Sequence, residues 1–146
     1  MSFDISHLLE QWAYAPGQVV VRRFVGKDGR DKIQLRVDLG LLQMNFSGRP
    51  DGKRPFGHPS FLEFYETKLK QHRLEHEGDE EFELKAEDCA RLQMESLQFH
   101  HRYFCLLQLE DYAAAIRDTA RNLKVFEFVE RYAATEELAV AGAEAS

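Results

Sequence analysis

Residues 98–123 read QFHHRYFCLLQLEDYAAAIRDTARNL and contain the clearest structural pattern in the chain. Their first half belongs to a predicted helix from about Asp88 to Leu109, with apolar residues around most of its circumference. Such a helix is typical of the middle of a bundle. Asp111 predicts the N-cap of a second helix. The apolar stripe of that helix comprises Tyr112, Ala115, Ile116, Thr119, Leu123, Phe126, Val129 and Ala133.

This segment resembles a tetratricopeptide repeat, in which a short turn joins two antiparallel helices. The positions that match the family pattern are Asp111, Tyr112, Ala115, Ile116 and Leu123, with Leu106 on the first helix. Tyr103 departs from the pattern, because it stands where the family has Gly or Ala, and Phe126 stands near the family's terminal Pro. The resemblance implies a helical hairpin of the kind that contacts other proteins.

A further helix is predicted before this pair. Ser60 and Glu63 form a capping-box pattern directly after Pro59. The helix extends to about Glu77, and Phe82 and Leu84 then predict a short extended piece. Its apolar stripe comprises Phe61, Leu62, Tyr65 and Leu69.

Residues 48–59, GRPDGKRPFGHP, hold three of the four prolines and three of the nine glycines. No regular element forms at that density of Pro and Gly. The segment therefore marks the boundary between a β-rich front and a helical back.

The front is predicted to contain an antiparallel hairpin around Asp28-Gly29. A two-residue turn would pair Phe24 with Ile33, whereas a three-residue turn would pair Val25 with Ile33. Beyond Gly40 the apolar positions shift by one residue, which predicts a β-bulge that bends the return strand.

These elements predict one domain over residues 1–146 with an α+β fold. The expected architecture is an N-terminal antiparallel β-hairpin or small bent sheet, packed with a C-terminal three- to four-helix bundle that contains the tetratricopeptide-like pair. A short helix capped by Asp4 precedes the strands. The expected parts are a β-rich front (1–47), a Gly/Pro/Arg loop (48–59), a helical back (60–135) and a frayed tail (136–146).

A second resemblance is to a family of uncharacterised bacterial proteins. It lies in DISHLLEQW (4–12), in a segment with KIQLRVDLGLLQM and GRPDG (32–57), and in DYAAAIRDTARNL (111–123). Some members of that family are labelled for a C-terminal UVR motif, a helical pair used for protein contact, but this chain shows no such motif. The resemblance implies no known reaction.

Charge is distributed unevenly along the chain. Residues 1–54 carry nine Arg and Lys against six acids, whereas residues 55–146 carry ten against 19, so the front is net +3 and the back net −9. The total of −6 argues against a dedicated nucleic-acid binder. Two such molecules would attract head to tail, or the basic front would hold an anion. The alternative is that both ends are ordinary solvated faces.

Cys89 and Cys105 lie on one predicted helix, roughly 24 Å apart and beyond disulfide reach. Two reduced thiols fit a cytoplasmic location. The chain has no run of about 18 apolar residues, so no membrane span is expected. Its first residues lack the basic region of a secretory signal.

His72 and His76 have a spacing that ligates zinc, and with Glu75 they form H-x-x-E-H, similar to the inverzincin pattern. A catalytic zinc site also needs a third ligand and supporting hydrogen bonds. The run LEHEGDEE at 74–81 favours solvent-facing histidines instead. His100 and His101 are adjacent and point to different faces of their helix.

Arg49, Lys53 and Arg54 are candidate anion contacts, because they lie in the glycine-containing 48–59 loop. Glycines allow backbone N–H groups to approach an anion, and arginine forms a fork for phosphate or carboxylate. The loop lacks nucleotide-binding spacings. The alternative is a rigid connector whose arginines pair with the acidic helices.

The residues favour a non-catalytic protein-interaction or scaffold module, without a cofactor and without catalytic residues. Its protein partner is not indicated by the sequence, and a second copy of the chain is one candidate. The first alternative is anion or nucleic-acid contact through the basic hairpin and the 48–59 loop. The second alternative is a metal-dependent hydrolase that uses His72 and His76.

Overall fold

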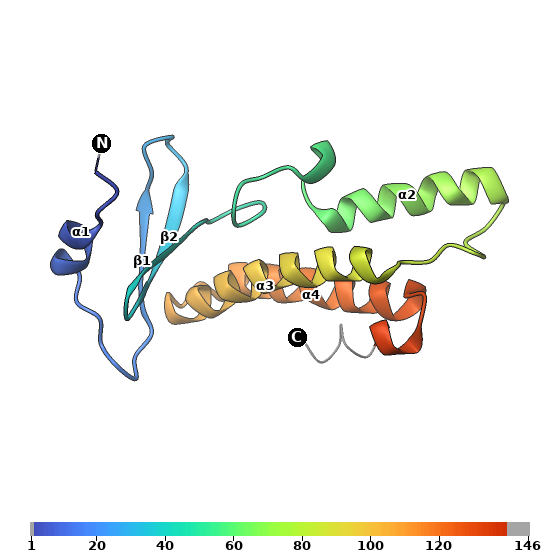
Figure 1. The fold of residues 1–146 in the computed structure, drawn as a ribbon. Coiled ribbons are helices and arrows are strands. Elements are labelled where there is room, and N and C mark those ends of the chain that lie inside the picture. Colours follow the sequence, from blue (N-terminus) through green and yellow to red (C-terminus); the bar gives the residue numbers. More distant parts are fainter. Residues whose placement is uncertain (1, 140–146) are drawn as a thin grey trace.

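The computed structural model describes residues 2–139 and has the predicted α+β fold (Figure 1). A three-stranded sheet lies at one end of a long helical hairpin, and a further helix packs along the other end. The elements are α1 (Ser6–Gln11), β1 (Val20–Val25), β2 (Asp31–Val37), β3 (Gly40–Asn45), η1 (Pro55–Gly57), α2 (Phe61–His76), α3 (Ala86–Gln108) and α4 (Tyr112–Tyr132).

The strands form an antiparallel sheet in the order β1-β2-β3. The β1–β2 hairpin is present, but both predicted registers are wrong, because Arg23 lies opposite Ile33. The cause is a longer turn, in which the Gly26 N–H donates to the Arg30 carbonyl at 2.8 Å and Gly29 adopts a φ of 78°.

The predicted bulge at Gly40 is also wrong. The chain reverses there, so that Val37 pairs with Gly40 across a tight turn and β3 returns alongside β2. Leu39 lies in this turn and is 87% exposed. The one-residue shift in the apolar pattern therefore marked a second hairpin.

The sheet is covered on both faces. On one face, Ile33 and Met44 pack against the helices. On the other face, the guanidinium of Arg22 lies 4.1 Å from the Trp12 ring centroid, and Arg36 Nε donates to the Trp12 carbonyl at 2.8 Å. Trp12, at the end of α1, thus covers polar side chains of the sheet.

The helix starts follow the predicted capping residues. Ser60 Oγ accepts from the Glu63 N–H at 3.2 Å, and Asp111 Oδ1 accepts from the Ala114 N–H at 3.2 Å. Because residue pairs such as Arg102–Asp118 and Ser96–Asn122 face each other, α3 and α4 run antiparallel.

The segment between α2 and α3 is attached to the end of α4. The Leu84 N–H donates to the Tyr132 carbonyl at 2.7 Å, and the Ala134 N–H donates to the Leu84 carbonyl at 2.8 Å. The extended piece predicted at Phe82–Leu84 is therefore anchored by a short parallel bridge. Residues 136–139, assigned to the frayed tail, are helical, and residues 140–146 lie outside the described part of the chain.

Two apolar cores lie along α3 and α4. The first joins α2 to both helices through Leu62, Tyr65, Leu69, Leu92, Val125 and Val129, among others. The second joins the sheet to them through Ile33, Met44, Cys105, Leu106, Ala114 and Ala115. The α3–α4 hairpin is therefore the part of the fold that both layers share.

Candidate docking surface

One side of the α3–α4 hairpin is apolar and uncovered among the described residues. Six large side chains on it are between 38% and 67% exposed. We call these residues the apolar face: Leu97, Phe104 and Leu107 of α3, and Tyr112, Ile116 and Leu123 of α4. They recur at helical spacings of three, four and seven residues, so each helix presents one continuous stripe.

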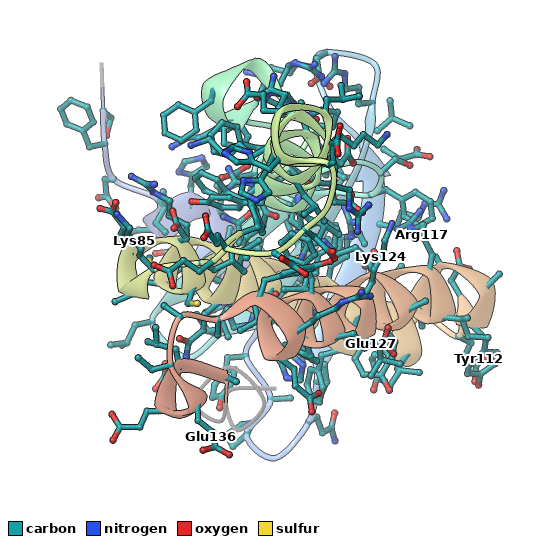
Figure 2. All side chains as sticks on the ribbon, turned by 90° about the vertical axis from the view of Figure 1, so that its right-hand side faces the viewer. Lys85, Tyr112, Arg117, Lys124, Glu127 and Glu136 are labelled. Carbon is teal, nitrogen blue, oxygen red and sulfur yellow. The ribbon has the colours of Figure 1, made fainter. Side chains whose placement is uncertain are left out.

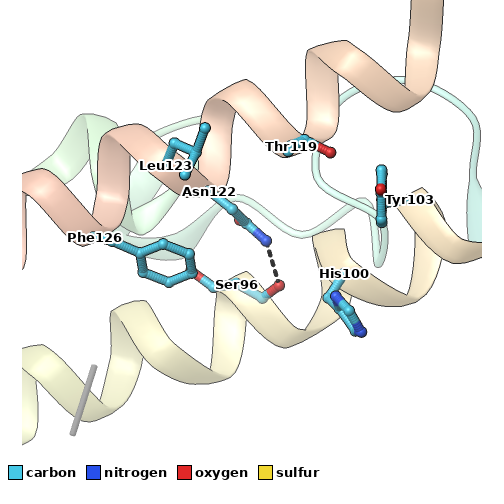
Figure 3. Close-up of a pocket in the computed structure, with 7 residues that line it drawn as sticks. All are labelled: Ser96, His100, Tyr103, Thr119, Asn122, Leu123 and Phe126. Carbon is cyan, nitrogen blue, oxygen red and sulfur yellow. Dashed lines mark hydrogen bonds between the residues drawn. The ribbon is translucent and has the colours of Figure 1, made fainter. Parts of the chain in front are cut away.

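The helical groove on this side holds two adjoining hollows. The first, of about 240 Å³, is lined by Ser96, His100, Tyr103, Thr119, Asn122, Leu123 and Phe126 (Figure 3). The second, of about 340 Å³, is lined by Tyr103, Leu107, Tyr112, Ala115, Ile116, Thr119, Ala120 and Leu123. Asn122 fixes the floor of the first hollow, because its Nδ2 donates to the Ser96 carbonyl at 2.9 Å.

The lining of both hollows contains no Asp, Glu, Lys or Arg, although 30% of the chain is charged. Most charged residues of α4 lie on other sides of the helix, whereas the exposed Glu130, seven positions after Leu123, extends the same stripe at its C-terminal end. Lys124 lies on the side towards α2, where its Nζ is 3.1 Å from Glu66 Oε2, whereas Tyr112 points the opposite way (Figure 2).

This arrangement corrects two predictions. The predicted stripe of α4 is buried only in part: Ala115 and Val129 are buried, whereas Tyr112, Ile116 and Leu123 are exposed. The buried positions are Ala114, Ala115, Asp118, Asn122, Val125, Val129 and Tyr132. Nor is α3 buried all round, since three residues of the apolar face belong to it.

A network of buried charges explains which side of α4 faces the interior. Arg102 donates from Nε and Nη2 to both carboxylate oxygens of Asp118, at 2.7 and 2.9 Å. Glu95, fully buried on α3, accepts from Arg49 Nε at 2.8 Å and from Arg121. Because these ion pairs turn polar residues of α4 inward, its apolar stripe is turned outward. Nothing in the local sequence marks such long-range pairs.

The tetratricopeptide-like positions are divided between the two sides of the hairpin. Asp111 caps α4 and Ala115 is buried against the sheet. Tyr112, Ile116 and Leu123 lie on the apolar face. The matched residues therefore include half of the apolar face.

The candidate anion loop is divided as well. Arg49 is held by Glu95 and by Asp51 Oδ2 at 2.9 Å. The Arg54 guanidinium donates to the Gly57 carbonyl at 3.0 Å, and Lys53 is exposed. Arg49 thus pairs with a carboxylate of a helix, as the alternative of a rigid connector expected. Among residues 2–139, the side chains of Arg49, Lys53 and Arg54 have no partner in common.

His72 and His76 stack on α2 with ring centroids 4.2 Å apart. His72 Nε2 lies 2.6 Å from the Glu80 carbonyl oxygen. Within residues 2–139, no group of three or more His, Cys, Asp or Glu side chains is arranged to hold a metal ion. His100 lines the first hollow, whereas His101 lies towards β3, so the adjacent pair does face two ways.

Comparison of the chain with models of protein families, with curated proteins and with solved structures finds no match. Both cysteines are buried and unpaired. Burial raises the pKa of Cys89, and it raises the pKa of Cys105 to about 11. Over residues 2–139, none of the helices has the length and apolar composition that a membrane span requires.

Proposed function

We propose that this protein is a self-associating interaction module, in which the apolar face of one copy packs against the apolar face of a second copy. The α3–α4 hairpins of the two copies would then form a four-helix bundle. The observation that carries this proposal is the uncharged, exposed apolar face on a hairpin whose other sides are covered by α2 and by the sheet.

The size of the apolar face supports a stable dimer. Its six exposed side chains present on the order of 600 Å² of accessible surface, if a free large side chain presents roughly 200 Å². Other residues that line the two hollows, such as Tyr103 and Phe126, add to this area. A standard interface takes about 800 Å² from each partner, so the face approaches that requirement.

Charge complementarity favours a second copy as the occupant. In a two-fold interface the same patch meets itself, so a patch that carried one sign of charge would face the same sign. The lining of the two hollows is free of such charges, whereas the chain as a whole carries −6. The tetratricopeptide-like signature agrees with this proposal, because a single repeat does not bury its own face.

We further propose that the module acts in a reducing compartment such as the cytoplasm. The support is that Cys89 and Cys105 are both unpaired and buried in apolar cores.

Sedimentation equilibrium of the wild type and of Ile116→Lys tests the dimer. We expect the wild type to be a dimer and Ile116→Lys to be a monomer. The circular dichroism spectrum of the variant should be unchanged, because Ile116 is 67% exposed and a lysine fits at this position in the monomer. Leu74→Lys is the matched control: it places the same charge at an exposed leucine on α2, and that variant should remain a dimer.

A wild type that stays monomeric at about 100 µM overturns the proposal, as does an Ile116→Lys protein that still dimerises. If the wild type is monomeric but binds a different protein, and Ile116→Lys does not bind that protein, then the apolar face is the docking site for that partner and self-association is wrong.

A further inference from the structure

A cavity of about 180 Å³ lies where the 48–59 loop meets the three long helices, away from the apolar face. Four arginines line it, and we call it the arginine cavity: Arg49 from the loop, Arg102 from α3, and Arg117 and Arg121 from α4. Ser60, Leu62, Glu63, Phe99 and Asp118 complete most of its wall. The volume would hold roughly six water molecules at about 30 Å³ each.

The four guanidinium groups share two buried carboxylates. Glu95 accepts from both Arg49 and Arg121. Asp118 accepts from Arg102, and its Oδ1 is 3.3 Å from Arg117 Nε. Each buried carboxylate therefore serves two cations, so the four arginines exceed these two acids by two charges before Glu63 at the rim and Asp51 outside Arg49 are counted.

The arginines are held in place before any ligand arrives. Two of them contact the Phe99 ring: the guanidinium carbon lies 5.0 Å from the ring centroid for Arg102 and 4.1 Å for Arg121. Arg102 Nη1 also donates to the Asn45 carbonyl at 2.9 Å, and Arg117 Nη2 to the Phe46 carbonyl at 2.8 Å. Fixed donors lose little conformational entropy when they bind an anion.

Burial opposes the concentration of positive charge here. It lowers the pKa of Arg121, and the nearby Arg49 guanidinium acts in the same direction, against the attraction of Glu95. A bound anion would stabilise both cations. Two further acids are close: Glu63 lies at the exposed rim, and Asp51 pairs with Arg49 on its outer side.

We propose that the arginine cavity binds a phosphate group, either as inorganic phosphate or as a phosphomonoester. Phosphate matches the planar donor forks of several arginines better than a halide does. Arg117 is the accessible member of the set, with 42% of its side chain exposed, so a ligand would enter beside it. The site does not depend on the proposed dimer, since it lies outside the apolar face.

Isothermal titration calorimetry with inorganic phosphate and with O-phosphoserine, at constant low ionic strength, tests the site. We expect binding near about 1 mM, weakened at least about tenfold in Arg117→Gln. Arg30→Gln removes the same charge from an exposed position in the β1–β2 turn and should bind as the wild type does. Glu63→Gln should bind more tightly, because it removes the negative charge at the rim.

The two ligands separate the sources of the phosphate group. Stronger binding of inorganic phosphate assigns the cavity to the free ion, whereas equal or stronger binding of O-phosphoserine assigns it to a phosphomonoester. No heat with either ligand at about 10 mM overturns the proposal. Equal losses in Arg117→Gln and Arg30→Gln also overturn it, because they would show only attraction to the net charge.

Discussion

Glu95 is a buried carboxylate at the point where the 48–59 loop meets the helices. Its carboxylate receives Arg49 and Arg121, and it also accepts from the backbone N–H of Phe61 at 2.8 Å, at the start of α2. It therefore connects the loop, α2, α3 and α4. Removing one partner from a buried ion pair leaves the other charge uncompensated.

We therefore predict that Glu95→Gln lowers the free energy of unfolding by about 3 kcal/mol. Urea denaturation followed by circular dichroism measures this change. Asp51→Asn, which weakens the exposed contacts of Asp51 with Arg49, the Lys53 N–H and Gln98 Nε2, should cost less than about 1 kcal/mol. Equal losses in the two variants would contradict the central role of Glu95.

A second residue-scale prediction concerns Cys105. Burial raises the pKa of its thiol from 9.0 to about 11. The unfolded chain therefore loses this proton at lower pH than the folded chain does. Its contribution to stability is complete below about pH 9 and is lost as the pH rises towards about 11.

Urea midpoints of the wild type and of Cys105→Ala, each measured at neutral and alkaline pH, test this contribution. The variant should lose less stability between the two pH values than the wild type does, whatever its stability at neutral pH. Parallel losses in the two proteins would show that the Cys105 thiol contributes nothing to the alkaline decline.

At the scale of elements, the turn between α3 and α4 stores backbone strain. Glu110 adopts a φ of 61°, in the left-handed region. Its N–H donates to the Leu107 carbonyl and the Asp111 N–H donates to the Leu106 carbonyl, both at 3.0 Å. This pair of hydrogen bonds is a Schellman motif, and glycine is the residue that fits its left-handed position without strain.

We predict that Glu110→Gly stabilises the protein by about 0.5–1 kcal/mol. Thermal unfolding followed by circular dichroism measures the gain. Glu110→Ala removes the same charge but keeps a Cβ at the strained position, so it should give no such gain. A similar gain in both variants would assign the effect to charge.

Local chemistry made many of these elements predictable. Ser60 and Asp111 predicted their helix starts because a capping residue acts on the N–H groups of the next turn. The buried side of α4 was not predictable, because Asp118 and Asn122 are buried only in the company of Arg102 and Ser96, on another helix. The hairpin at Gly40 was mistaken for a bulge because both produce the same one-residue shift in the apolar pattern.

The candidate site shows the same division. The residues Tyr112, Ile116 and Leu123 were singled out from the sequence, but within an apolar stripe that also includes the buried Ala115 and Val129. The arginine cavity brings together Arg49 and three arginines of α3 and α4 that are more than fifty positions away in the chain. Only one of its four arginines was identified from the sequence, because the others stand within apolar helices.

For the whole molecule, the proposed dimer links thermal stability to concentration. Because only the folded state dimerises, the Tm of the wild type should rise when the protein is concentrated tenfold. The Tm of Ile116→Lys should not change with concentration. Differential scanning calorimetry measures both, and a wild-type Tm that is independent of concentration would contradict the dimer.

The Leu84 bridge has a practical consequence for shortened versions of this protein. A chain cut after Tyr132 loses the Ala134 N–H that donates to the Leu84 carbonyl, and with it one of the two backbone bonds that hold the α2–α3 segment. A truncation boundary beyond Ala134 keeps both bonds. The minimal helical fragment thus ends after the last residue of α4, because residues beyond α4 pair with Leu84, some fifty positions earlier in the chain.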